Sequence, residues 1–202
     1  MNVNVLVADL APNPLALVFF GGRPSLPKAM KHDWPRCSQC SGPMQYLGRV
    51  PHPNPSKQIF IFQCANDPGM CDEWDPESGG NCAMIVDIAD AVRPTKPPRK
   101  GVTALDGTWS GHAEECVADS YSDAREEADA NGWSVIGQLG GVPDWLQEDE
   151  TPECPACGNP MVLAAQLEEG PDDRTAMNFG GGGCGYVFVC PCPAGEARFL
   201  WQ

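Results

Sequence analysis

Two ten-residue stretches of this chain nearly repeat each other. "PRCSQCSGPM" covers residues 35–44 and "PECPACGNPM" covers residues 152–161, and each has two cysteines separated by two residues, followed by Pro-Met. A Cys-x-x-Cys turn directs both sulfurs toward one metal ion, and zinc favours four tetrahedral thiolate or imidazole ligands. The repeat therefore predicts two zinc knuckles, and the fold must bring further ligands to each of them.

More cysteines follow the first knuckle. Cys64 ends a β-rich run, and the loop "ANDPG" can fold Cys71 back beside it. Cys82 is a rival for the fourth position, but it opens an apolar strand, where cysteine more often serves as a small hydrophobic residue. The predicted ligands of the first site are Cys37, Cys40, Cys64 and Cys71.

The second knuckle has three candidates for its remaining ligands. Cys190 and Cys192 fit because alternate side chains of an extended chain share a face. Cys184 fits less well, since six residues of strand span roughly 20 Å. The glycines at 180–183 leave a broken strand open as an alternative. The predicted ligands of the second site are Cys154, Cys157, Cys190 and Cys192.

Eight cysteines complete two closed sites of four thiolates each. A catalytic zinc keeps an open position and usually has histidine or carboxylate ligands. A closed zinc site instead contributes folding free energy, about 10–16 kcal/mol in small zinc peptides. We therefore expect two structural Zn²⁺ ions and no catalytic residue at either site.

The two halves of the chain also match in order outside the knuckles. Gly21-Gly22-Arg23-Pro24 precedes the first knuckle as Gly140-Gly141-Val142-Pro143 precedes the second, and the runs "IFIFQC" and "GYVFVC" end at Cys64 and Cys190. Matching blocks in the same order are typical of a duplicated unit. The pattern predicts an α+β fold that is predominantly β, internally duplicated, and pseudo-twofold in architecture.

This organisation sets the predicted boundaries. An N-terminal lobe with the first zinc site covers residues 1–92, a Pro-rich linker covers residues 93–104, and a C-terminal lobe with the second site covers residues 105–202. Together the lobes form one domain. The linker contains "RPTKPPRKG" and has no apolar periodicity, so we interpret it as a solvated connector.

Residues 111–131, "GHAEECVADSYSDAREEADAN", have small or apolar residues at helical spacing. We predict a helix there, capped by Ser110 and ended by Gly132. On such a helix His112 and Cys116 would be neighbours and could form a nucleophile set with Asp119, a weaker hypothesis than packing.

The composition limits the partners. The net charge is −14, so phosphate backbones and anionic membranes would repel the chain, and a basic protein partner is favoured. The acidic stretches 114–129 and 144–153 are the candidate surfaces for that partner. No apolar run is long enough to span a membrane, and no basic region precedes the first apolar run, so we expect a cytoplasmic protein with reduced cysteines.

Other signals for chemistry are weak. His32 and His52 lie in Pro- and Lys-containing loops without a catalytic motif, and "NFGGGGCG" lacks the Lys-Ser/Thr of a phosphate-binding loop, which favours a tight turn. The sequence favours a zinc-stabilised, non-enzymatic protein-binding module. The alternative is a metal-dependent hydrolase with a site between the lobes.

These motifs together resemble a known family. "GGVPDWLQ", "TPECPACGNPMVLAAQL" and "NFGGGGCGYVFVC", with "IFIFQCANDPGMCDEWDPESGGN" in the first half, are similar to the YwqG-like family of bacterial proteins of unknown function. The layout more distantly resembles the eukaryotic programmed cell death protein family with paired Cys-x-x-Cys units. The resemblance implies a duplicated, mostly β fold without an established activity, and a role in toxin immunity or as a dedicated chaperone.

Overall fold

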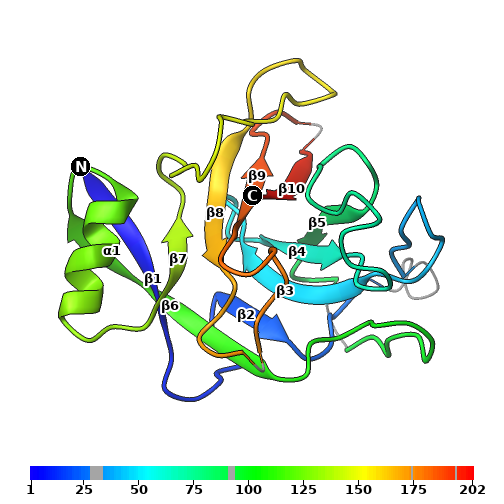
Figure 1. The fold of residues 1–202 in the computed structure, drawn as a ribbon. Helices are drawn as coiled ribbons and strands as arrows, with labels where there is room; N and C mark the ends of the chain where they lie inside the picture. Colours follow the sequence, from blue (N-terminus) through cyan, green and yellow to red (C-terminus); the bar gives the residue numbers. More distant parts are fainter. Residues whose placement is uncertain (28–33, 91–93, 174, 194) are drawn as a thin grey trace.

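The computed structural model describes residues 1–27, 34–90, 94–173, 175–193 and 195–202, and these residues form one ten-stranded sheet and one α-helix (Figure 1). His32 and Arg93 lie outside the described residues. The elements are β1 (Asn2–Ala8), β2 (Val18–Gly21), β3 (Gln45–Pro51), β4 (Lys57–Gln63), β5 (Asn81–Asp87), β6 (Thr108–Val117), α1 (Tyr121–Ala130), β7 (Val135–Leu139), β8 (Val162–Glu168), β9 (Cys184–Val189) and β10 (Ala197–Trp201). The prediction of a predominantly β fold is confirmed.

The sheet order is β10-β9-β8-β7-β1-β6-β2-β3-β4-β5, and every neighbouring pair is antiparallel. Strands β1 and β6 pair along their length at the centre, from Asn2↔Val117 to Ala8↔Gly111. Outward from this pair, β2–β5 form a meander on one side and β7–β10 form a meander on the other. Each central strand therefore pairs with the meander of the opposite half of the chain.

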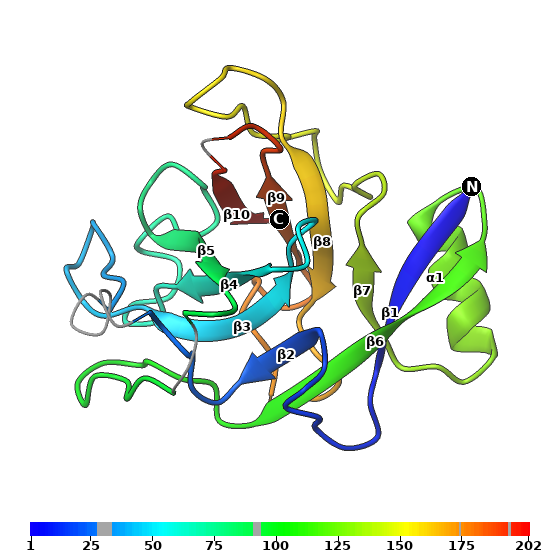
Figure 2. The same cartoon turned by 180° about the vertical axis from the view of Figure 1, so that it is seen from behind.

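The two edge strands of the sheet, β5 and β10, contact each other (Figures 1 and 2). Where they approach, the backbone N–H of Trp201 donates to the carbonyl of Trp74 over 3.3 Å, and the two indole rings meet edge to face. The sheet thus curls almost into a barrel, which covers its edges against pairing with other chains.

The largest core cluster lies inside this curled sheet and takes side chains from both halves. Phe20 stacks on Trp109 with ring centroids 4.0 Å apart, and Phe179 packs against Phe199. The fully buried members of this cluster include Leu6, Phe20, Leu47, Val50, Ile59, Ile61, Ile136, Ala165, Leu167, Val187 and Phe199. Burial of apolar surface on this scale is the main stabilising contribution to the sheet.

The region predicted as one helix is a strand followed by a shorter helix. Residues 108–117 form β6, and the helix begins only at Tyr121, with the Ser120 hydroxyl accepting the N–H of Asp123 over 3.1 Å. Helical spacing was misleading here because β6 hydrogen-bonds to both β1 and β2, and such pairing overrides weak helical periodicity. Tyr121, Ala124 and Ala128 do face the core, against the valines of β1.

The segment predicted to be a solvated connector is bound to the first half instead. Thr95 is buried: its N–H donates to the carbonyl of Pro24 over 2.7 Å, and its hydroxyl accepts the N–H of Leu26 over 3.2 Å. At the other end, the carbonyl of Thr103 accepts the N–H of Tyr46 over 3.1 Å. Buried backbone bonds hold the segment in place, and the prolines did not signal them.

The β-rich runs that end at Cys64 and Cys190 form β4 and β9, and Cys82 is the second residue of β5, near the start of the predicted apolar strand. Strands β1 and β2 are consecutive in the sequence but do not pair with each other, because β6 lies between them. Among the described helical residues, none forms a span long and apolar enough to cross a membrane.

Candidate metal centres

The structure brings eight cysteine sulfurs into two groups of four. Within each group all the sulfurs lie within 4.8 Å of one another. The first cysteine cluster is Cys37, Cys40, Cys64 and Cys71, and the second cysteine cluster is Cys154, Cys157, Cys190 and Cys192. These are the two sets that the spacing predicted; their role as metal ligands is developed under Proposed function.

The first cluster is built by a knuckle before β3 and by the connection between β4 and β5. In the knuckle, the N–H of Cys37 donates to the carbonyl of Gly42 over 2.9 Å, and the N–H of Ser41 donates to the carbonyl of Cys37 over 2.9 Å. Ser41 has φ of 58°, a left-handed conformation that closes the turn. Cys64 follows β4 directly, and Cys71 returns from the loop.

The loop that carries Cys71 is held by a buried carboxylate. Glu73 is 1% exposed, and its side chain accepts the N–H groups of Gly69, over 2.5 Å, and of Cys71, over 3.3 Å. The side-chain amide of Asn81 donates to the carbonyl of Glu73 over 2.9 Å. The acidic stretch after Cys71 therefore shapes the backbone around the cluster as well as lying at the surface.

The second cluster has the same kind of knuckle as the first, but its other two cysteines are arranged differently. The N–H of Cys154 donates to the carbonyl of Asn159 over 2.9 Å, and Gly158, with φ of 69°, donates to the carbonyl of Cys154 over 2.8 Å. Cys190 follows β9 directly, and Cys192 lies two residues later in the connection to β10. Both of their sulfurs lie within 4.8 Å of the knuckle sulfurs, and the chain bends at Cys192, whose N–H donates to the Cys190 sulfur over 3.4 Å.

The sulfur separations match one tetrahedral ion per cluster. Four sulfurs at about 2.3 Å from a zinc ion lie roughly 3.8 Å from one another. The Cys40–Cys64 sulfurs are 3.7 Å apart, the Cys154–Cys192 sulfurs 3.8 Å, and the Cys157–Cys190 sulfurs 3.6 Å. The donor set and its spacing therefore fit a closed Cys₄ zinc site at both places.

Amide groups donate to the sulfurs of both clusters. The N–H of Gly42 lies 3.4 Å from the Cys40 sulfur, and the Asn66 side-chain amide lies 3.4 Å from the Cys64 sulfur. In the second cluster, the N–H of Cys192 lies 3.4 Å from the Cys190 sulfur, and the Asn159 amide lies 3.6 Å from the Cys157 sulfur. Such donors stabilise negative charge on thiolates and orient them.

Burial and hydrogen bonding act in opposite directions on the thiols of the first cluster. The Gly42 N–H lowers the pKa of Cys40, whereas burial raises the pKa of Cys64 and of Cys71. Several thiolates at this spacing repel one another, so keeping all four deprotonated requires a cation between them. A divalent metal ion with soft character would supply that charge.

The two rival cysteines, Cys82 and Cys184, stand outside the clusters. Cys82 lies on β5 opposite Phe62, and burial raises its pKa to about 12. Cys184 opens β9, where its N–H donates to the carbonyl of Gln202, and burial raises its pKa to about 11. Cys184 is buried and Cys82 is partly buried, and each packs in the hydrophobic cluster that contains the neighbouring candidate cysteine ligands.

The glycine-rich segment after β8 forms an anion cradle that the protein fills itself. The Glu169 carboxylate accepts the backbone N–H groups of Phe179 and Gly181, each over 2.9 Å, and of Gly182, over 3.0 Å. Successive N–H groups in such a turn bind anions. Because Glu169 occupies these donors, the segment is a structural turn in this state, as the absence of a phosphate-loop lysine predicted.

The hypothesis of a nucleophile set on one helix is wrong. His112 and Cys116 lie on strand β6, where a separation of four residues corresponds to roughly 13 Å. The Nδ1 atom of His112 is 2.7 Å from Asp9. Cys116 packs against the hydrophobic cluster formed by the valines of β1 and the buried face of α1. The acidic partner of His112 comes from the chain segment after β1, which no local motif indicated.

Sequence reasoning missed the polar residues around the clusters. Asn66 and Asn159 each follow a candidate ligand by two residues, after Cys64 and Cys157, and that spacing was a visible signal. Asn66 also donates to the carbonyl of Pro43 over 3.0 Å, so it joins the knuckle to the loop. Glu73 gave no comparable signal, because a burial of 99% is not expected for a glutamate in an acidic loop.

No family model matches the sequence. A stretch of 60 residues, 29% of the chain, is 37% identical to the uncharacterized protein YpfL of Salmonella typhimurium, and this match covers 13% of that protein. The chain therefore spans only a small part of this relative. The resemblance to the YwqG-like and programmed cell death protein families stays a prediction.

Proposed function

We propose that each cysteine cluster binds one structural Zn²⁺ ion and that the protein is a non-enzymatic binding module. The observation that carries the proposal is the closure of both clusters: each has four sulfurs at the spacing of a tetrahedral zinc ion, so neither leaves a position for an activated water. The metal then acts by tying loops to strands. A reducing, cytoplasmic compartment fits eight cysteines kept as thiolates.

Metal content and thiol reactivity test this proposal. Mass spectrometry of the purified chain under native conditions should give two zinc ions per molecule. Alkylation should spare the eight clustered cysteines until a chelator removes the metal. Cys116, which is partly exposed on β6, serves as the internal control for reagent access. A single labile metal that exchanges quickly and supports hydrolysis would instead favour the alternative, a metal-dependent hydrolase.

We place the partner surface on the acidic side of α1. Glu126, Glu127 and Asp129 are exposed there, and Ser122 donates a hydrogen bond to Asp144, so the two predicted acidic stretches are neighbours. Opposite charge speeds association and makes it sensitive to salt. The proposed partner is a basic protein, either a toxin held inactive or a basic client protected before assembly.

Gene neighbourhood and binding kinetics separate these roles. An adjacent toxin gene supports immunity, and an adjacent gene for a basic ribosomal protein supports chaperoning.

Binding of the candidate should slow when Glu126 and Glu127 are changed to Gln. The matched control changes Asp87 and Asp90, at the end of β5, to Asn. Equal effects of both pairs would argue against a specific acidic surface.

We also infer that the chain is an internal duplication in which the first strands of the two units are exchanged. Two observations support this. The strand order is symmetric about the central β1–β6 pair, and matching bulges occur at Leu47 between β3 and β4 and at Ala164 between β8 and β9. Because β1 pairs with β7 and β6 pairs with β2, neither half should fold alone. Co-expressed halves should assemble, and a half that folds by itself would contradict the exchange.

A further inference from the structure

A groove on the first half of the chain concentrates positive charge in a protein of net charge −14. It has a volume of about 590 Å³ and lies between the chain after β2 and the two ends of the segment that precedes β6. Its lining includes Arg23, Lys96 and Arg99. The groove is separate from both cysteine clusters.

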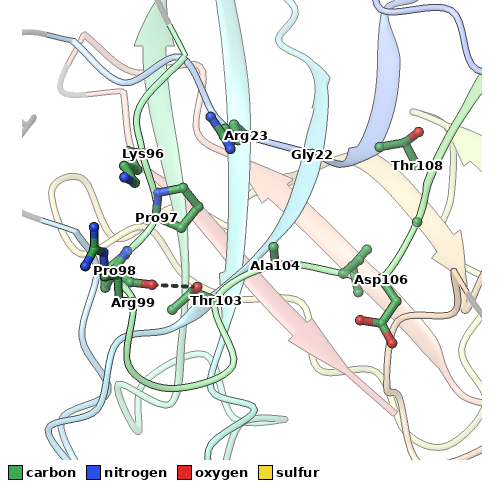
Figure 3. Close-up of a pocket in the computed structure, with 12 residues that line it drawn as sticks. Gly22, Arg23, Lys96, Pro97, Pro98, Arg99, Thr103, Ala104, Asp106 and Thr108 are labelled. Carbon is green, nitrogen blue, oxygen red and sulfur yellow. Dashed lines mark hydrogen bonds between the residues drawn. The ribbon is translucent and has the colours of Figure 1, made fainter.

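The three cations are exposed and available to a ligand. In the part of the chain that the structure describes, none of Arg23, Lys96 and Arg99 forms an ion pair. Figure 3 shows them gathered at one end of the groove, with Asp106 toward the opposite end. Like charges that line one groove repel one another, and an anion bound in the groove would relieve that repulsion.

The lining of the groove is largely apolar. It includes the rings of Pro97 and Pro98 and the side chain of Leu105. The Thr103 hydroxyl donates to the carbonyl of Pro98 over 3.2 Å, so the two ends of the loop are fixed to each other. A fixed, largely apolar lining with charged residues lowers the entropy cost of binding.

We propose that this groove binds an extended acidic peptide segment of a partner protein, with its carboxylates at the Arg23–Lys96–Arg99 end. The groove is open and shallow, which suits a peptide that lies along it more than a small ion enclosed by it. Its volume matches a few side chains. A nucleic acid would extend past the groove onto the acidic surface that dominates this chain, where its phosphates would be repelled.

The test uses the 202-residue chain purified with zinc present and a fluorescein-labelled ten-residue peptide, Glu-Glu-Glu-Leu-Pro-Leu-Gly-Ser-Gly-Lys. This probe presents carboxylates to the basic end and a lysine toward Asp106. Fluorescence anisotropy should show saturable binding that weakens about tenfold between 50 and 300 mM salt. The peptide with Lys in place of each Glu should not bind.

Charge-removing variants locate the site. Arg23→Gln, Lys96→Gln and Arg99→Gln should each weaken binding about two- to fivefold, and the triple variant more than tenfold. Lys57→Gln on β4, which does not line the groove, is the matched control and should leave binding unchanged. Circular dichroism and zinc content should be the same for all variants, because all three cations are exposed.

Three outcomes would overturn the proposal. The peptide fails to bind, or the triple variant binds as well as Lys57→Gln, or a short single-stranded oligonucleotide or inorganic pyrophosphate binds more tightly than the peptide at the same site. None of these outcomes bears on the metal proposal, because the groove shares no residue with either cluster.

Discussion

The two cysteine clusters have similar knuckles but differ in the spacing of their second pair of cysteines. Both knuckles close with a left-handed residue after the second cysteine, Ser41 in the first and Gly158 in the second, and both are flanked by an isolated antiparallel bridge ending at a proline. The second pair differs: six residues separate Cys64 from Cys71, whereas one separates Cys190 from Cys192.

This difference decides how much structure each ion would hold. In the first cluster, a metal would close the loop 65–70, and Glu73 and Asn66 support this loop with hydrogen bonds to backbone and sulfur. In the second cluster, the knuckle sulfurs meet a short segment that contains both Cys190 and Cys192, with the Asn159 amide beside the Cys157 sulfur. The geometry of a knuckle is thus set by a few neighbouring residues, whereas the position of the second pair of cysteines depends on the loop and strand that carry it.

The largest expected effect comes from removing one knuckle cysteine in either cluster. Cys37→Ser and Cys154→Ser should each lower the zinc content from two ions to one, because a three-sulfur site binds zinc far more weakly. Cys154→Ser should unfold the C-terminal part, and hydrogen exchange should show lost protection in β9 and β10 while β3–β5 retain more.

The corresponding readout for Cys37→Ser is lost protection in β3–β5. Since the central core is shared between the halves, some loss should also reach the opposite meander. A variant that binds no metal at the altered cluster yet keeps wild-type exchange rates throughout would disprove the structural role of the ion.

A smaller effect is expected from the asparagines beside the sulfurs. Asn66→Ala should weaken zinc binding at the first cluster about tenfold or more, since its amide reaches two sulfurs and the carbonyl of Pro43. Asn159→Ala should cost less, because its amide reaches only the sulfur of Cys157 among the contacts described. Competition with a chromogenic chelator measures the zinc affinity of both variants. An equal loss of affinity in the two variants would contradict a larger role for Asn66 than for Asn159.

Two substitutions at the left-handed residues of the knuckles should change the stability of the protein in opposite directions. Gly158→Ala should destabilise the protein by about 1 kcal/mol, since φ is 69° there and an added Cβ meets no neighbour that could compensate. Ser41→Gly should stabilise it slightly, because glycine adopts φ of 58° without strain. Urea denaturation of the zinc-bound variants gives both values, and the same sign for both would show that backbone strain does not govern the turn.

No change in metal content is expected from the two cysteines outside the clusters. Cys82→Ala and Cys184→Ala should each retain two zinc ions and lose about 1 kcal/mol of stability through lost packing. Elemental analysis of the purified variants checks this. Loss of one zinc ion from either variant would mean that the ligand set of that cluster has been assigned wrongly.

Local sequence was informative wherever structure depended on neighbours in the chain. The Cys-x-x-Cys spacing and the cysteine at the end of a β-rich run indicated three sulfurs of each group that the fold brings together. Loop length and side-chain alternation then favoured Cys71 and Cys192 over the rivals Cys82 and Cys184. Strand positions also followed, because runs such as "IFIFQC" are apolar and β-branched and are buried in the sheet.

Local sequence was misleading where pairing partners lie far apart in the chain. Residues 111–117 have helical spacing, yet they form the central strand because β1, over a hundred residues earlier, offers a complete ladder of hydrogen bonds. The segment 94–104 is proline-rich like a linker, yet buried bonds from Thr95 and Thr103 hold it.

The sequence by itself determined which sulfurs are available in pairs, where most strands lie, and the acidity of the surface. Only the tertiary structure decided that β1 and β6 pair at the centre, that the sheet edges meet, and that three cations line one groove. The physical reason is range: turn geometry and side-chain alternation act over a few residues, whereas sheet order and burial are set by the free energy of the whole assembled core.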